Sequence, residues 1–192
     1  FLSGGSQLRL TSTLGGTSLS AAIVRRHAEG MVVAGTSAGA AVLSEHMIAF
    51  GDSGGTPRRR LVQLAPGLGL ARGILIDQHF RQRDRLGRLL AALSLNPGPL
   101  GVGIDEDTAA VIECGTGRDP SPARLTVIGK GAVTVVDASG LLYTNGDHVG
   151  AQQPIALLGL CLDVLIAGCG YDLHSRRALP PGGAGGSISE AS

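Results

Sequence analysis

Apolar and polar residues alternate along this chain in blocks that predict helices separated by short strands. The strongest pattern covers about residues 83–95, where Leu86, Leu89, Leu90 and Leu93 recur at helical spacing before Asn96-Pro97 ends the run. Weaker patterns predict helices at about residues 6–10, 18–27 and 38–47. Short apolar runs predict strands at about residues 31–34, 61–64, 74–76, 102–104, 109–113, 125–128, 132–136 and 160–167. The strands at 125–128 and 132–136 are expected to form a hairpin.

Strands that alternate with helices are typical of an α/β fold with a mostly parallel sheet flanked by helices. The 192 residues are enough for one domain, which we expect at residues 1–179. Residues 180–192, PPGGAGGSISEAS, are expected to be a disordered tail. The chain begins at Phe1 without Met, and Phe1-Leu2 has the pattern of a strand end. We therefore expect a partial domain, incomplete at its amino end.

Composition narrows the function classes. A formal net charge of +1 and an aromatic content of 3% without Trp argue against nucleic-acid binding and against attraction to membrane surfaces. Cys114, Cys161 and Cys169 form no C-x-x-C pair, which is typical of reduced thiols in a cytoplasmic protein. The apolar stretch at residues 155–170 contains Asp163 and is too short to span a bilayer.

Residues 35–39 read Gly-Thr-Ser-Ala-Gly, directly after the apolar run 31–34 and before a stretch compatible with a helix. This is the G-x-S-x-G pattern of a nucleophile elbow in its strand–turn–helix context. Small neighbours allow the strained bend that lifts the Ser37 hydroxyl clear of the sheet. The pattern predicts a serine hydrolase.

A serine nucleophile needs a base and an acid that orients it. Of the five histidines, His79 is the best placed, because it follows a predicted strand and catalytic residues of α/β enzymes project from the carboxyl ends of strands. His27 and His46 are expected on helices, and His148 and His174 in loops. The candidate acids are Asp105-Glu106-Asp107, of which at most one should enter a site, and Asp77. The residues alone leave this choice open.

Two further features surround these candidates. Arg81, Arg83, Arg85 and Arg88 load the start of a predicted helix with positive charge, against a macrodipole effect of about 0.3–1 kcal/mol each. Their forked guanidinium groups suit a pocket for carboxylates. The turn Ser3-Gly4-Gly5 could supply an oxyanion hole, in which the N–H of Gly4 or Gly5 acts together with the N–H of Ala38.

These residues together resemble one known family, the cyanophycinases. The motifs that carry the resemblance follow one another over about residues 1–137, and a looser match continues near residues 160–173. They are Gly4-Gly5-Ser6-Gln7-Leu8-Arg9-Leu10, Gly35-Thr36-Ser37-Ala38-Gly39-Ala40, Pro66-Gly67-Leu68-Gly69, Asp77-Gln78-His79-Phe80 with Arg83, Arg85 and Arg88, and Gly103-Ile104-Asp105-Glu106-Asp107-Thr108-Ala109.

The resemblance implies a fold and an activity. Cyanophycinases are serine-type exopeptidases related to the α-aspartyl dipeptidase peptidase E, with a fold similar to class I glutamine amidotransferases, a flavodoxin-like three-layer sandwich. They degrade cyanophycin, a polyaspartate backbone with arginine on each β-carboxylate, to β-Asp-Arg dipeptides. The implied partners are therefore cyanophycin or peptides that contain β-aspartyl-arginine, without cofactor or metal, and a homodimer is compatible with this.

The resemblance also implies roles for single residues. Ser37 would be the nucleophile, His79 the general base and Glu106 the acid. The order Ser, His, acid differs from that of α/β-hydrolases, which argues against an ordinary esterase. The positions that match substrate-binding residues of the family are Gln7, Asp77, Gln78, Arg83, Arg85 and Arg88. Two alternatives stay open: an α-aspartyl dipeptidase of the peptidase E type, and a catalytically silent fragment or binding module.

Overall fold

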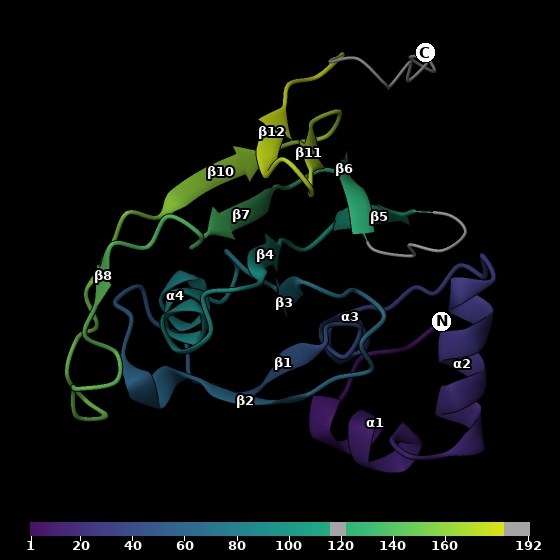
Figure 1. Ribbon diagram of the computed structural model, residues 1–192, viewed down its shortest axis with the longest axis horizontal. Coiled ribbons are helices and arrows are strands. Elements are labelled where there is room, and N and C mark those ends of the chain that lie inside the picture. Colours follow the sequence, from purple (N-terminus) through teal and green to yellow (C-terminus); the bar gives the residue numbers. More distant parts are fainter. Residues whose placement is uncertain (116–121, 183–192) are drawn as a thin grey trace.

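The computed structural model describes residues 1–115 and 122–182 of the chain (Figure 1). Part of the expected tail, residues 183–192, lies outside the described residues. The helices are α1 Gln7–Leu14, α2 Ser18–Ala28, α3 Ala38–Ala41 and α4 Leu86–Leu95, with a short 3-10 turn at Arg59–Leu61. The strands are β1 His46–Phe50, β2 Gln63–Pro66, β3 Ile74–Gln78, β4 Leu100–Ile104, β5 Thr108–Cys114, β6 Pro122–Gly129, β7 Val133–Asp137, β8 Tyr143–Thr144, β9 Leu157–Leu158, β10 Cys161–Leu165, β11 Gly170–Asp172 and β12 Arg177–Leu179.

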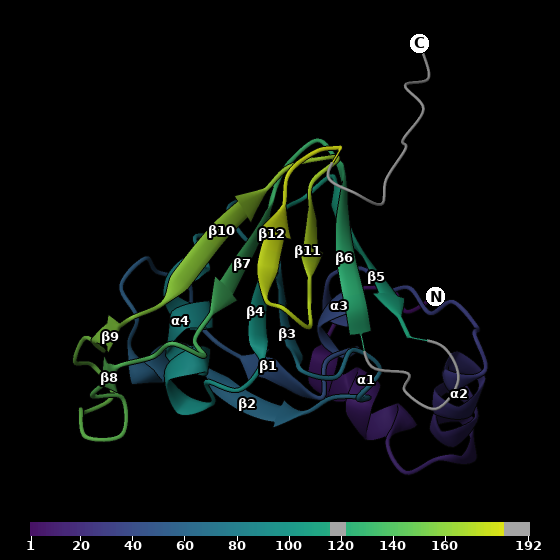
Figure 2. The ribbon, with the colours of Figure 1, turned by 45° about the horizontal axis from the view of Figure 1, so that its top comes forward.

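Two four-stranded sheets form the body of the molecule. The central sheet has the order β10-β7-β4-β3, and the second sheet has the order β12-β11-β6-β5. Figure 2 shows them as separate layers that lean together at one end. Two shorter pairs, β1-β2 and β8-β9, lie outside these sheets.

The protein is a mixed α/β structure, but the expected mostly parallel sheet is wrong for the described residues. There, β3 and β4 pair in parallel, and every other ladder is antiparallel. The expected strand at 31–34 forms no ladder in the described residues, and the adjacent Gly35 makes one parallel bridge to Leu2. Backbone bonds from Leu2 N to Ala34 O (2.8 Å) and from Thr36 N to Leu2 O (3.0 Å) hold this bridge.

The core lies on both faces of the central sheet, because side chains alternate along each strand. On one face, Ile74 and Ile76 of β3 pack with Val133 and Val135 of β7 against the second sheet, including the fully buried Tyr171. A second sheet therefore covers the face where helices were expected. Its edge strand β5 alternates between half-buried and exposed positions, as a strand with one apolar face does.

On the opposite face, Leu75 packs against α4, whose Leu89 and Leu93 are fully buried. This confirms the expected leucine stripe, although the helix begins at Leu86 rather than at residue 83. The β1-β2 pair and α1 extend this side of the molecule, and Val42 and Met47 join them in a smaller cluster. Helices α1 and α2 contain no fully buried residue and lie together beside the amino end (Figure 1).

Two expectations fail because backbone partners far along the chain override the local pattern. The helix expected at 38–47 ends at Ala41, since the carbonyls of residues 42–45 accept bonds from the segment 67–71, for example from Leu68 N to Val42 O at 2.7 Å. The expected hairpin of 125–128 and 132–136 is also wrong. The first of these strands, β6, pairs with β5 and β11, whereas β7 pairs with β4 and β10 in the other sheet.

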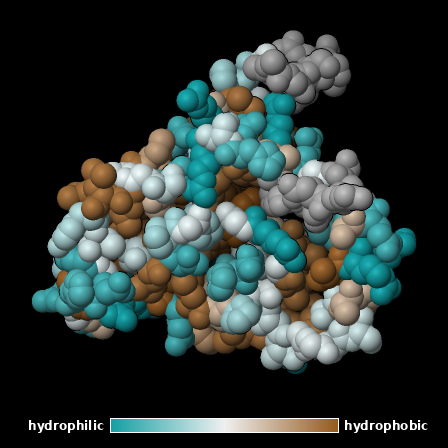
Figure 3. Space-filling model, in the orientation of Figure 1, coloured by the Kyte–Doolittle hydropathy of each residue, from teal (hydrophilic) through white to brown (hydrophobic). Residues whose placement is uncertain are grey.

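Several apolar side chains remain at the surface. Figure 3 shows them over the region of β8 and β10, where Leu142, Leu158 and Val164 are each more than half exposed. No helix in residues 1–115 and 122–182 is long and apolar enough to cross a membrane.

Candidate active site

Ser37 occupies a strained bend that only small neighbours permit. Its φ of 52° and ψ of −119° lie outside the favoured regions for an L-residue, at a cost of about 1–3 kcal/mol. A Cβ atom on Gly35 would lie 2.1 Å from the backbone oxygen of Gly39, and one on Gly39 would lie 2.1 Å from the oxygen of Leu2. Both glycines of the G-x-S-x-G pattern are therefore required by close backbone approaches.

The turn before α1 borders this bend. A Cβ atom on Gly4 would lie 3.2 Å from Ser37 Cβ and 3.6 Å from Ser37 Oγ, so the backbone of Gly4 lies beside the hydroxyl. Gly5 follows with a φ of 130°. Ala38, whose N–H is the other candidate oxyanion donor, begins α3 and is 1% exposed. The candidate oxyanion donors Gly4 and Ala38 thus both adjoin Ser37.

His79 and Glu106 come from the ends of two neighbouring parallel strands. His79 follows β3 and Glu106 lies two residues beyond β4, so both are at the same edge of the central sheet. His79 Nε2 lies 3.0 Å from Ser37 Oγ, and His79 Nδ1 lies 2.7 Å from Glu106 Oε1. The Glu106 carboxylate only accepts hydrogen bonds, so the ring proton of His79 lies on Nδ1. Nε2 is then free to accept a hydrogen bond from the Ser37 hydroxyl. This arrangement can activate Ser37 as a nucleophile.

Asp77, the rival acid, is engaged elsewhere. It is 1% exposed, and Arg88 binds it with two nitrogens, with Nε 2.6 Å from Oδ2 and Nη2 bonded to Oδ1. Arg85 Nη1 lies 3.5 Å from Asp77 Oδ1 and donates to Gln78 O at 2.5 Å. The backbone N–H of Gln78 also donates to Asp77 Oδ1 at 2.8 Å. Glu106 is the carboxylate bonded to His79 in this structure.

The Asp77–Arg85–Arg88 cluster carries one more positive than negative charge in the interior. Burial lowers the pKa of Arg85 to about 10, and the charges of Arg88 and Arg83 act in the same direction, whereas Asp77 opposes them. The buried Nε of Arg85 has no hydrogen-bond partner in the described part of the chain. Of the arginines expected to bind substrate, Arg83 is exposed, and Arg85 and Arg88 are buried.

The two expected glutamines lie differently. Gln78, 8% exposed, has its Oε1 3.4 Å from Ser37 Oγ and so lies beside the nucleophile. Gln7 donates from Nε2 to Ile48 O at 3.0 Å, which ties α1 to β1. Gln7 is therefore held by the fold, while Gln78 borders the reacting group.

The other histidines lie apart from the Ser37–His79–Glu106 arrangement. His27 contacts Met31 O through Nδ1 at 3.1 Å, and its Nε2 lies 3.9 Å from Cys114 Sγ. His46 was expected on a helix and instead begins β1, where it is exposed. His148 and His174 are exposed in turns, as expected. Within residues 1–115 and 122–182, no group of three or more His, Cys, Asp or Glu side chains could hold a metal ion.

Gln82 is a site residue that no sequence pattern indicated. Its Oε1 accepts from the backbone N–H of Glu106 at 3.1 Å, so it contacts the residue bonded to His79. Glutamine in an arginine-rich turn carries no motif of its own. The feature of the sequence that could have indicated Gln82 is its position three residues after His79, in the same turn.

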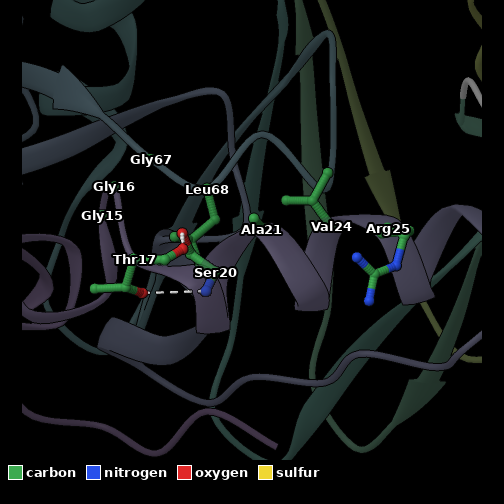
Figure 4. A pocket seen from close by; sticks show the side chains of 9 residues that line it. All are labelled: Gly15, Gly16, Thr17, Ser20, Ala21, Val24, Arg25, Gly67 and Leu68. Carbon is green, nitrogen blue, oxygen red and sulfur yellow. Dashed lines mark hydrogen bonds between the residues drawn. The ribbon is translucent and has the colours of Figure 1, made fainter.

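A surface pocket lies apart from this arrangement. A pocket of about 550 Å³ lies between α2 and the segment Gly67-Leu68, and Ser37, His79 and Glu106 are not part of its lining (Figure 4). There Thr17 caps α2 by accepting from Ser20 N at 3.2 Å, and Val24 and Arg25 line the far end. Ser37, His79 and Glu106 thus lie outside this pocket.

The sequence of this chain is similar to those of known proteins. A family model described as peptidase family S51 matches residues 1–118. Three relatives named cyanophycinase are similar over 94% of this chain: those of Trichormus variabilis (49% identical over 182 residues), Geminocystis herdmanii (47% over 182) and Synechococcus elongatus (45% over 187). The chain covers 58%, 63% and 56% of these relatives, in that order, and so spans less than two thirds of their length.

Proposed function

The chain belongs to peptidase family S51, and we propose that it is a serine exopeptidase that hydrolyses cyanophycin to β-Asp-Arg dipeptides. The observation that carries this proposal is the hydrogen-bonded arrangement of Ser37, His79 and Glu106, which we call the relay. In it His79 Nε2 lies 3.0 Å from Ser37 Oγ, and His79 Nδ1 lies 2.7 Å from Glu106 Oε1. The names of the relatives supply the substrate. The 61% of the chain that the family model covers includes all three relay residues.

The relay supports acyl transfer in two steps. Ser37 Oγ attacks the backbone carbonyl next to a terminal β-aspartyl-arginine unit, while His79 Nε2 takes the hydroxyl proton and Glu106 holds the imidazole in orientation. The backbone N–H groups of Ala38 and of Gly4 or Gly5 stabilise the oxyanion. His79 then gives its proton to the leaving amine as the C–N bond breaks. Water, deprotonated by His79, then cleaves the resulting ester, and His79 returns the proton to Ser37 Oγ as the acyl group leaves as a carboxylic acid.

Substrate binding is assigned to Gln7, Asp77, Gln78, Arg83, Arg85 and Arg88 as part of this proposal. Arg83 is exposed and can bind a free carboxylate of the substrate with both arms of its guanidinium. Gln78 lies beside Ser37 and can contact the reacting unit. Asp77, Arg85 and Arg88 are buried, so they contribute through their net positive charge behind the site and by holding Gln78.

The class I glutamine amidotransferase-like layout belongs to the same proposal. The parallel pair β3-β4, with His79 and Glu106 beyond its carboxyl ends, is the part of the described structure that supports it. Catalytic residues at that edge are typical of parallel α/β sheets.

The test is incubation of the chain with cyanophycin and measurement of free β-Asp-Arg by mass spectrometry. We expect release by the wild type and a fall of at least about 10⁴-fold in kcat for Ser37→Ala. A fluorophosphonate probe should label the wild type and leave Ser37→Ala unlabelled. Labelling without release would reject the substrate, and α-aspartyl dipeptides are then the substrates to assay. A folded wild type without labelling would reject the serine hydrolase and favour a binding module.

A further inference from the structure

The loops that carry His79 and Glu106 are tied together beyond the end of the β3-β4 ladder. The ladder ends at the pair Gln78 and Ile104, and Phe80 N continues it by donating to Ile104 O at 3.1 Å. Beyond this bond, side-chain oxygens replace backbone carbonyls as the acceptors between the two loops. Arg81 N donates to Asp105 Oδ1 at 3.0 Å, and Glu106 N donates to Gln82 Oε1 at 3.1 Å. Each loop thus offers one side-chain acceptor to a backbone N–H of the other.

A second set of bonds fixes Glu106 from the side of the second sheet. Thr108 Oγ1 donates to Glu106 O at 3.0 Å and accepts from Gly131 N at 2.9 Å. Asp105 Oδ2 accepts from Ala132 N at 3.2 Å in the same turn between β6 and β7. The backbone of Glu106 is therefore held at its N–H by Gln82 and at its carbonyl by Thr108.

These bonds matter because the His79–Glu106 contact contributes little free energy of its own to keep the two side chains together. The side chain of Glu106 is 51% exposed and that of His79 is 25% exposed. Ion pairs with such exposure contribute about 0–1 kcal/mol. His79 itself and Asp107, the residue after Glu106, have φ values of 49° and 54° and thus adopt a sparsely populated conformation. The short distance therefore needs restraints from outside the pair.

We propose that Gln82, Asp105 and Thr108 form a loop clamp, a set of positioning residues that holds Glu106 against His79 Nδ1. The clamp rests on the proposed function, because the imidazole that the clamp orients is that of His79, the general base of the proposed peptidase. In the described part of the chain, none of its three side chains is hydrogen-bonded to Ser37. They act through the backbone of the two loops, which sets where the carboxylate can lie.

The clamp predicts a loss of turnover without a loss of binding. In Gln82→Met the side chain keeps its size but loses the acceptor for Glu106 N. Thr108→Val loses the hydroxyl that donates to Glu106 O, whereas Thr108→Ser keeps it. Misplacement of a catalytic group by about 1 Å costs up to about 100-fold in rate. We expect kcat to fall about 10–100-fold in Gln82→Met and Thr108→Val, with KM within about twofold of the wild type.

The matched controls are Thr108→Ser and Lys130→Met. Lys130 is exposed in the turn next to Gly131, and its side chain is outside the clamp. Both variants should keep kcat within about twofold of the wild type. Thermal unfolding shows which variants are folded at the assay temperature. Gln82 is exposed, so Gln82→Met is expected to fold even if Thr108→Val does not.

A spectroscopic readout separates the clamp from the proposed function. The His79 Nδ1 proton, identified by its absence in His79→Gln, should give a downfield NMR signal that weakens in Gln82→Met and Thr108→Val and persists in both controls. If the wild type releases no dipeptide, the proposed function fails and this signal still decides on the clamp. Unchanged kcat together with an unchanged signal in folded Gln82→Met would overturn the clamp, as would a change in KM alone.

Discussion

His79 Nε2 lies 3.0 Å from Ser37 Oγ, although 42 positions separate the two residues along the chain. The central sheet sets this distance. His79 directly follows β3, and Ser44, buried just after the elbow helix, accepts from Ile76 N of the same strand at 3.0 Å. The elbow and the histidine are thus both anchored to β3. Because both residues also have positive φ, the surrounding packing must hold two strained backbone positions to bring the reacting atoms together.

Replacement of the acid tests the relay directly. Glu106→Gln keeps the size of the side chain but replaces the acceptor-only carboxylate with an amide, so the Nδ1–H tautomer of His79 is no longer specified. We expect kcat to fall by about 10⁴-fold. The free energy of unfolding, measured in urea, should stay within about 0.5 kcal/mol of the wild type, because the side chain is 51% exposed. Full turnover by Glu106→Gln would remove Glu106 from the catalytic set.

Asp77 should respond in the opposite way. Asp77→Asn leaves Arg85 and Arg88 in the interior without their carboxylate, and breaking a buried ion pair costs about 3–5 kcal/mol. We expect a large loss in the free energy of unfolding. At a temperature where the variant is still folded, labelling of Ser37 by a fluorophosphonate should persist. If Asp77→Asn lost labelling and turnover at unchanged stability, Asp77 and not Glu106 would be the orienting acid.

The sequence predicted those elements whose pattern is strong and locally complete. The leucine stripe of α4 and the apolar runs of β3 and β4 are confirmed, since the helix buries Leu89 and Leu93 at helical spacing and the two strands are buried almost throughout. The helix expected beyond Ala41 failed because its carbonyls bond to residues 67–71, which no local pattern reveals. The pairing of β6 and β7 failed for a similar reason: adjacent apolar runs do not say which sheet each one joins.

The candidate site was predictable to a different extent. The elbow follows from residues 35–39 alone, and its two glycines meet backbone oxygens as such a turn requires. Charge and spacing could not choose between Asp77 and Glu106, because both follow or end a strand near His79. The geometry separates them, with Asp77 bound by two arginines and Glu106 by His79. Gln82 could not be predicted, since its contact with Glu106 depends on how two loops meet.

The stability of the chain should depend on pH through Asp137, at the end of β7. Burial by itself would raise the pKa of Asp137, but bonds from Ser139 N (2.8 Å), Arg176 Nη1 (2.5 Å) and Ser139 Oγ (3.0 Å) outweigh burial, and the pKa lies below its ordinary value of 3.8. A carboxyl with a depressed folded pKa stabilises the fold above its unfolded pKa, and this contribution is lost as pH falls through the folded pKa.

Urea unfolding of the wild type and of Asp137→Asn at a series of pH values measures this contribution. Above about pH 5 the variant should be less stable by about 1–3 kcal/mol, because charged hydrogen bonds to Arg176 and Ser139 are lost. Below the ordinary carboxyl pKa of 3.8 the wild type becomes protonated as it unfolds, and the gap should shrink as pH falls further. Arg177→Gln, which changes the neighbouring exposed arginine, should keep the wild-type pH profile. A gap that stays constant or widens down to about pH 3 would show that Asp137 does not have a depressed pKa in the folded chain.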